Sequence, residues 1–197
     1  MTGLAEVDLV LASTSRYRRD LLARLASRFR TLAPDVDETG FSGEMPATLV
    51  ERLALAKARA VARECPNALV IGSDQVAELD GRILGKPGSV EAAQAQLAAS
   101  SGRHVIFHTA LCLLDTRNDR TGVAIDVTRV VFRTLDAAEI SRYIEAERPL
   151  DCAGSFKAEG LGISLFERIE SEDPTALIGL PLIALARLLR AAGIGLP

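Results

Sequence analysis

Stretches of strand character and stretches of helical character alternate along this chain. The expected strands are short apolar runs bounded by polar or turn residues, at residues 7–13, 67–74, 104–115, 122–135 and 163–170. The expected helices, recognised by apolar periodicity or by capping residues, lie at residues 15–25, 45–63, 90–99, 137–146 and from Pro181 to Gly193. Such alternation is typical of α/β proteins, in which helices cover both faces of a central sheet.

The sequence "VAELDGRIL" (76–84) excludes a purely parallel sheet. Its two short runs flank Asp80-Gly81, a dipeptide that favours a two-residue β-hairpin. Because such a hairpin joins antiparallel strands, we expect a mixed sheet. The chain has 197 residues and no low-complexity linker, so we expect one domain, residues 1–197, large enough to form two lobes.

Composition excludes several classes of protein. The net charge of −3 argues against a partner that is a nucleic acid polymer or an anionic membrane. Aromatic residues make up only 4% of the chain and Trp is absent, which disfavours a base-stacking platform. No apolar run approaches the ~20 residues of a membrane span. The three cysteines, Cys65, Cys112 and Cys152, show no paired spacing, and we expect a reduced, cytoplasmic protein.

The segment "LVLASTSRYRRDLL" (9–22) places arginines at the start of a helix, against its dipole. A bound phosphate would account for this arrangement, because it satisfies Arg18, the hydroxyls of Ser13 and Ser15, and the free N–H groups of the first helical turn. The alternative is a solvated helix that Ser15 caps and whose arginines point into water. This segment alone leaves both interpretations open.

A second segment, "IGSDQVAELDGRILGKPGS", carries two charged candidates. Asp74 falls where a buried strand is expected to end, the edge at which α/β folds bind ligands. Lys86 follows twelve residues later in a Gly-Lys-Pro-Gly turn. In isolation the pair is best explained as a surface ion pair. Beside a phosphate site, Asp74 becomes a candidate base or metal ligand and Lys86 a charge clamp.

Two further segments place charges near helix 45–63. The loop "DVDETG" holds Asp35, Asp37 and Glu38, whose oxygens suit Mg²⁺ or Mn²⁺, although a solvated acidic loop is the simpler interpretation. Lys57 lies among alanines on an otherwise apolar helix. A lysine in that setting usually extends its ammonium group along the surface into water.

Seven segments together provide a more specific signal than any one of them. In chain order they read "LASTSRYRRDLL", "DVDET", "RLALAKA", "GSDQV", "LGKP", "RPLDCAGSFKAEGLG" and "GLPLIAL". This series, which spans nearly the whole chain, resembles the Maf family of nucleoside triphosphate pyrophosphatases. Ser-Asp-Gln at 73–75 and the "AGSFKAEG" stretch are most similar to the branch acting on 7-methyl-GTP. The sister branch, acting on dTTP and UTP, typically has Thr after the Asp, and Gln where Glu159 stands.

The resemblance implies an inosine-triphosphatase-like α/β fold, with an elongated mixed sheet and two lobes around a nucleotide cleft. It also implies a homodimer and a divalent cation (Mg²⁺, Mn²⁺ or Co²⁺). The implied site residues are the proton acceptor Asp74, the metal ligands Glu38 and Asp74, the specificity residues Tyr17, Gln75 and Glu159, and the phosphate-binding residues Ser13, Ser15, Arg18, Lys57 and Lys86. The chain departs from this branch at Tyr17, where Trp is usual, and at Arg16, where Pro is usual.

The activity implied is cleavage between the α- and β-phosphates of a nucleoside triphosphate, with 7-methyl-GTP giving 7-methyl-GMP and pyrophosphate. Two alternatives remain. One is the dTTP/UTP specificity of the sister branch, which Gln75 and Glu159 disfavour. The other is a non-catalytic nucleotide-binding protein that controls cell division. A base such as Asp74 disfavours that second alternative, because binding alone requires no proton acceptor.

Overall fold

A computed structural model describes residues 2–196 of the chain, which form two compact units. The first unit takes in the described residues up to Asp74, then Thr109–Asp126 and Asp173 onward. The second unit is made of Gln75–His108 and Val127–Glu172. That these units are two lobes of a single domain around a cleft stays a prediction. None of the helices within residues 2–196 combines the length and apolarity needed to span a bilayer.

The expected α/β class with a mixed sheet is confirmed. The main sheet has the strand order β3-β2-β4-β6-β7-β8, with β5 beside β4. Strand β2 runs parallel to β3 and β4, whereas β5 is antiparallel to β4 and β8 to β7. The strands are β2 (Asp8–Ala12), β3 (Arg30–Leu32), β4 (Ala68–Leu79), β5 (Arg82–Leu84), β6 (His104–Asp115), β7 (Arg120–Phe132) and β8 (Phe166–Glu170). A separate parallel pair joins β1 (Thr2–Gly3) to β9 (Ile194–Gly195).

Within residues 2–196, capping side chains start three of the five α-helices where the sequence predicts. The Oγ atoms of Ser15 and Ser89 and the Oδ1 atom of Asp136 accept hydrogen bonds from backbone N–H groups three residues on. The helices are α1 (Arg16–Leu22), α2 (Pro46–Ala62), α3 (Val90–Ser100), α4 (Ala137–Glu147) and α5 (Leu182–Ala191). Short 3₁₀ turns are η1 (Leu4–Glu6), η2 (Ala153–Ser155), η3 (Leu161–Leu165) and η4 (Ala176–Ile178).

Several predicted boundaries are wrong. Helix α1 ends at Leu22, with Ala23 as its cap, because the following N–H groups of Arg24 and Leu25 bond three residues back rather than four. Strand β8 starts only at Phe166, since η3 occupies the residues before it. Pro181 caps α5 instead of being its first residue. Strand β4 continues past Asp74 to Leu79, because pairing with β5 extends it, and β3 was not predicted at all.

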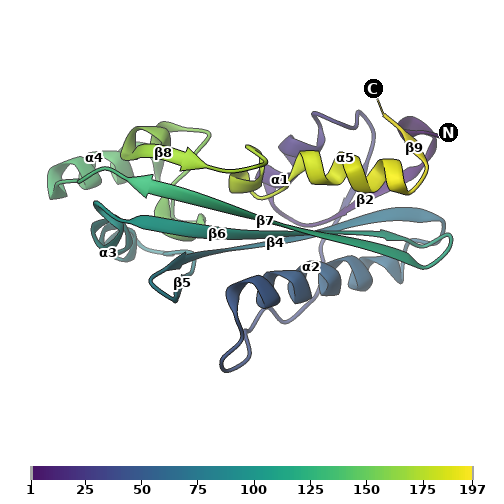
Figure 1. The fold of residues 1–197 in the computed structure, drawn as a ribbon, viewed down its shortest axis with the longest axis horizontal. Coiled ribbons are helices and arrows are strands. Elements are labelled where there is room, and N and C mark those ends of the chain that lie inside the picture. The colour runs from purple at the N-terminus through teal and green to yellow at the C-terminus, as the bar shows by residue number, and fades with distance from the viewer. Residues whose placement is uncertain (1, 197) are drawn as a thin grey trace. The chain divides into compact units, whose positions relative to one another are not determined.

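Helices cover both faces of the strands within the first unit, as Figure 1 shows for α2 on one side and α1 and α5 on the other. Alternate residues of β2 and β4 form a leucine-rich core with α1 and α5. On the opposite face, a Cβ atom at Gly72 would lie 2.1 Å from the carbonyl oxygen of Ala54 in α2. Glycine therefore lets the backbones of α2 and β4 approach each other closely.

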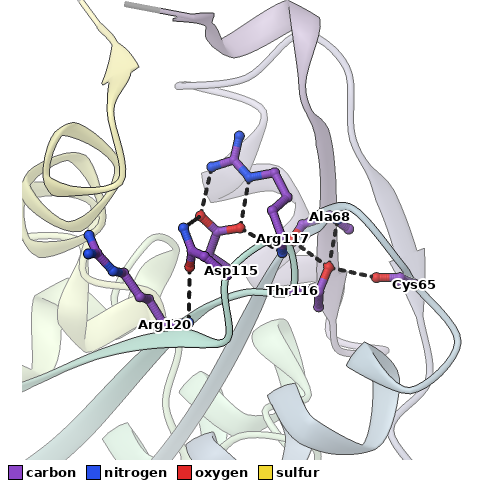
Figure 2. Close-up of polar contacts among 7 residues, drawn as sticks. Cys65, Ala68, Asp115, Thr116, Arg117 and Arg120 are labelled. Atoms are coloured by element: carbon purple, nitrogen blue, oxygen red, sulfur yellow. Dashed lines mark hydrogen bonds and ion pairs between the residues drawn. The ribbon is translucent and has the colours of Figure 1, made fainter.

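A polar turn closes the β6–β7 hairpin within the first unit (Figure 2). The buried carboxylate of Asp115 accepts two 2.7 Å bonds from the Arg117 guanidinium, which lowers the pKa of Asp115. The neighbouring Thr116 hydroxyl accepts from the Ala68 N–H at 2.8 Å and donates to the Cys65 carbonyl at 2.9 Å. These bonds connect the hairpin to the start of β4.

Aromatic packing organises the second unit. The rings of Phe107, Phe132, Phe156 and Phe166 meet edge-to-face, with centroids 4.7–5.6 Å apart. In the β4–β5 hairpin, Asp80 and Gly81 have φ values of 48° and 78°, the left-handed conformations of the predicted two-residue turn.

Candidate active site

A buried ion pair joins α2 to β4. The Lys57 ammonium group lies 2.6 Å from Oδ1 of Asp74, and the two residues are only 5% and 6% exposed. Lysines and aspartates are rarely buried to this degree unless they are paired. The expectation that the Lys57 ammonium reaches into water is therefore wrong. The close approach of α2 at Gly72, two residues before Asp74, is what brings the lysine to this strand.

The acidic loop before α2 supplies a second carboxylate to the same lysine. Oε1 of Glu38 lies 2.6 Å from the Lys57 ammonium, although the Glu38 side chain is 59% exposed. One ammonium group thus bridges a buried and an exposed carboxylate. The idea of a merely solvated acidic loop does not hold for Glu38.

Arg52, which sequence reasoning missed, holds this loop against α2. Its guanidinium donates two 2.7 Å bonds to the Glu44 carboxylate and one 3.1 Å bond to the Thr39 carbonyl. It also lies 4.2 Å from the ring centroid of Phe41. Its position at the start of "RLALAKA", five residues before Lys57, was the available signal. These contacts fix the backbone that directly follows Glu38.

Arg18 extends from α1 to a glycine far along the chain. Its Nε donates a 2.9 Å bond to the carbonyl of Gly179, a contact that the sequence did not predict. Burial lowers the pKa of the guanidinium, while the charges of Asp74 and Glu38 oppose that change. An arginine keeps its charge under such conditions because its intrinsic pKa is so high. Arg18 therefore adds a second cation whose charge acts on the same two carboxylates.

The serines before α1 bind backbone groups. Oγ of Ser13 accepts a bond from the Ser15 N–H at 3.1 Å, and Oγ of Ser15 accepts one from the Arg18 N–H at 3.4 Å. The interpretation of Ser15 as a helix cap is confirmed. Participation of Ser13 and Ser15 in phosphate binding stays a prediction.

Arg16 and Arg19, the other two arginines at the start of α1, have nearby partners. Arg16 donates a 2.8 Å bond to the Tyr17 hydroxyl, and its guanidinium carbon lies 4.7 Å from the centroid of the Tyr17 ring. Arg19 pairs with Asp20 on an exposed surface. A protein cation thus already lies against the aromatic ring expected to contact the base.

The environment of Asp74 favours a proton-accepting carboxylate. Burial raises its pKa, the charge and hydrogen bond of Lys57 and the charge of Arg18 lower it, and the charge of Glu38 raises it. The net result is an elevated pKa. A carboxylate with a raised pKa is a stronger base when ionised, which suits proton transfer from water.

The carboxylate pair fits a partly hydrated divalent cation. Within residues 2–196, no three His, Cys, Asp or Glu side chains come together as a ligand set. Mg²⁺ is commonly bound by one or two carboxylates together with substrate phosphates and water, so a larger protein set is not required. Glu38 and Asp74, which share one ammonium group, supply such a pair of oxygen donors.

The remaining predicted residues belong to the second unit. Gln75 is half-buried on β4, whereas Lys86 and Glu159 are exposed on loops. The loop that carries Glu159 is held at Lys157, whose N–H donates to the Tyr143 hydroxyl at 3.0 Å and whose ammonium group donates to the Glu147 carbonyl at 2.6 Å. Burial raises the pKa of Tyr143, the bond from the Lys157 N–H opposes that change, and the nearby charges of Glu147 and Glu159 add to it.

The structure thus joins Glu38, Lys57 and Asp74 by direct contacts, and the charge of Arg18 acts on both carboxylates. It places Gln75, Lys86 and Glu159 in another unit, where their parts in a site stay predictions. His104 and His108 of β6 belong to that unit as well, and the ring of His108 bonds to the Glu78 carboxylate at 2.8 Å.

Comparison with known proteins relates the chain to one family. Residues 8–192 match the family described as Maf-like protein. The 7-methyl-GTP pyrophosphatase of Xanthomonas oryzae pv. oryzae (strain MAFF 311018) is 62% identical over 189 residues, 96% of this chain and 98% of that protein. Proteins of the same name are 58% identical in Burkholderia thailandensis (94% of this chain, 87% of that protein) and 57% in Aromatoleum aromaticum (96% and 97%). Among solved structures, the Staphylococcus aureus Ham1 protein is 19% identical with a TM-score of 0.43, over 64% of this chain and 71% of that one. The chain belongs to the Maf family.

Proposed function

We propose that this protein hydrolyses the α–β phosphoanhydride bond of nucleoside triphosphates, with 7-methyl-GTP as its substrate and 7-methyl-GMP and pyrophosphate as products. The observation that carries the proposal is the Lys57 ammonium group bridging Asp74 and Glu38, with the Arg18 charge beside them. This cluster contains both the proton acceptor and the cations that such a hydrolysis needs. Relatives that are 57–62% identical over nearly the whole chain are named for this activity.

Asp74 is the proton acceptor in the proposed reaction. A water molecule loses a proton to the Asp74 carboxylate while its oxygen forms a bond to the α-phosphorus. The bond from that phosphorus to the bridging oxygen breaks, and the pyrophosphate leaves with the bonding electron pair. The raised pKa of Asp74 favours this proton transfer.

Cationic side chains stabilise the negative charge that develops on the leaving group. Lys57 and Arg18 lie in the first unit, and Lys86 is the candidate in the second. Preorganised charges of this kind are a large part of catalysis in phosphoryl transfer. Glu38 and Asp74 would hold the divalent cation, which supplies further positive charge to the phosphates when it is bound.

Substrate choice is proposed to depend on the charge of the base. Methylation at N7 makes the guanine ring cationic. A carboxylate at Glu159 favours that charge, and Gln75 offers an amide that can read the base edge. The Tyr17 ring offers a π face to a cationic base, and such contacts are worth about 0.5–2 kcal/mol. We further propose that the protein works as a homodimer in the cytoplasm, in keeping with its three free cysteines.

A screen for pyrophosphate release tests the proposal. Canonical and N7-methylated triphosphates are incubated with the protein and Mg²⁺, Mn²⁺ or Co²⁺. We expect the largest kcat/KM for 7-methyl-GTP and no release without a cation. A preference for dTTP or UTP would contradict the specificity. Tight nucleotide binding without any release would contradict the enzyme and favour a nucleotide-sensing protein.

A further inference from the structure

The turn between η4 and α5 contains Gly179 of the "GLPLIAL" segment, to which the proposed function assigns no part. The carbonyl of Gly179 accepts a hydrogen bond from Nε of Arg18 at 2.9 Å and lies 2.9 Å from the Ser73 hydroxyl, which shares its single proton between this carbonyl and that of Ala110 at 2.8 Å. A carbonyl oxygen has two lone pairs and can satisfy both donors. Ser73 is fully buried and directly precedes Asp74. One backbone atom thus connects Arg18 to the strand that carries the proposed base.

This turn is held firmly on both sides. Before it, the Thr109 hydroxyl donates to the Ala176 carbonyl at 3.1 Å. After it, the buried carboxylate of Asp173 accepts from the Ile183 N–H at 2.7 Å, and the Thr175 hydroxyl accepts from the Leu182 N–H at 2.8 Å. These two bonds cap α5, whose own cap residue is a proline without a capping side chain.

The turn requires glycine because of its backbone conformation. Gly179 has a φ of +120°, which side-chain-bearing residues rarely adopt. A Cβ atom there would lie 3.5 Å from Nε of Arg18, an ordinary contact distance, so space is not the constraint. Substitution would therefore act by turning the carbonyl away from Arg18.

We propose that Gly179 and Ser73 are positioning residues for Arg18, and that the 178–181 turn exists to orient its guanidinium group. Nε of Arg18 bonds to the Gly179 carbonyl, and the two NH₂ groups make no hydrogen bond within residues 2–196. These two groups can therefore donate to a phosphate. A free arginine side chain loses considerable rotamer entropy on binding, and the Gly179 carbonyl removes part of that cost beforehand. The catalytic part of this inference rests on the proposed function.

A double-mutant cycle tests the coupling. Arg18→Lys keeps the charge but lacks the Nε–H fork, and Gly179→Ala disturbs the carbonyl. We expect each single variant to lower kcat/KM for 7-methyl-GTP about tenfold or more, mainly through KM, the loss typical of a hydrogen bond to a charged group. The double variant should be no worse than Arg18→Lys alone. If the fold losses in kcat/KM of the two single variants multiply in the double variant, the inference is overturned.

Two further variants separate positioning from folding. Gly193→Ala is the matched control, because Gly193 also has positive φ (+83°) in the same unit, with nothing near its absent Cβ. It should leave kcat/KM unchanged within about twofold. If Gly179→Ala fails to fold, Ser73→Ala replaces it in the cycle. We expect Ser73→Ala to lower kcat/KM about threefold in the unmodified protein and not at all in the Arg18→Lys background. If Ser73→Ala also lowers kcat/KM in the Arg18→Lys background, the inference is overturned.

A readout without turnover keeps the inference separate from the proposed function. The Arg18 Nε–H resonance, assigned by its absence in Arg18→Lys, should exchange slowly with solvent in the unmodified protein and quickly in Gly179→Ala. Unprotected exchange in the unmodified protein would refute the positioning contact. If the Arg18 Nε–H exchanges slowly but the protein releases no pyrophosphate, the proposed activity is refuted while the positioning contact stands.

Discussion

The two units present their predicted site residues in different ways. In the first unit, Lys57 and Asp74 are buried and joined at 2.6 Å, so each charge depends on the other. In the second unit, which has an aromatic core, Lys86 and Glu159 are exposed on loops. Buried, paired groups are preorganised and sensitive to any change, whereas exposed groups are adaptable and screened by water. The difference suits the proposed proton transfer at Asp74 in the first unit and the proposed discrimination by Glu159 in the second.

Asp74→Asn is expected to have the largest effect on activity. Asparagine keeps the shape of the side chain but is not a base, so kcat should fall by about 10³-fold or more while nucleotide affinity changes little. Steady-state kinetics and calorimetric binding measure the two quantities. Asp8→Asn, which affects only an exposed ion pair with Arg30, is the control and should retain full activity. A near-normal rate in Asp74→Asn would remove the base from the proposed mechanism.

Phe156→Ala probes the support of the second unit. Phe156 contacts the rings of Phe107, Phe132 and Phe166, so truncation leaves a cavity among buried side chains. We expect the free energy of unfolding to fall by about 3–5 kcal/mol. Urea denaturation measures this loss. Phe41→Ala is the matched control, since Phe41 is largely exposed, and it should cost far less. Equal losses would show that the aromatic cluster is not the core of this unit.

Lys57→Met tests how far the first unit depends on charge compensation. Removing the ammonium group leaves a buried carboxylate at Asp74 without its partner, and such a change costs about 3 kcal/mol. Adding Asp74→Asn removes the stranded charge and should recover most of that stability. Urea denaturation of both variants provides the comparison. If the double variant is less stable than Lys57→Met, the loss comes from packing and not from charge.

Glu159→Gln addresses discrimination in the second unit. Because Glu159 is exposed, its charge is screened, and we expect the ratio of kcat/KM for 7-methyl-GTP over GTP to fall only about two- to tenfold. Glu145→Gln, an exposed change on α4 of the same unit, should leave the ratio unaltered. Parallel rate measurements with both nucleotides test this. An unchanged ratio for Glu159→Gln would refute a charge-based preference.

Whether an interaction is local or long-range decides which features of the fold and of the site the sequence predicts. Strands, caps and the Asp80-Gly81 hairpin follow from local chemistry, and the structure confirms them. Three-residue β3 carries too little local signal, and the η3 turn replaces the start of a predicted strand. Long-range contacts leave no local pattern, so neither the 2.9 Å bond from Arg18 to Gly179 nor the loop contacts of Arg52 were predicted.

Glu44→Gln is expected to have the smallest effect, and it depends on pH. Hydrogen bonds from Arg52, and then from the Phe41 N–H, hold the pKa of Glu44 at about 2 instead of its ordinary 4.5. A lowered pKa stabilises the folded state above pH 4.5, and this contribution disappears as the pH falls from 4.5 towards about 2. The difference in Tm between the unmodified protein and Glu44→Gln should therefore be greatest above pH 4.5 and shrink over that interval.

The exposed Glu51 of α2 provides the control for this measurement. Glu51→Gln removes the same charge from a carboxylate that takes part in no described ion pair or hydrogen bond, so it is the matched variant against which Glu44→Gln is measured. The catalytic rate of Glu44→Gln should fall only slightly, because Arg52 still donates to the Thr39 carbonyl and lies against Phe41. A difference in Tm for Glu44→Gln that is constant with pH would mean that the carboxylate charge does not hold the loop of Glu38.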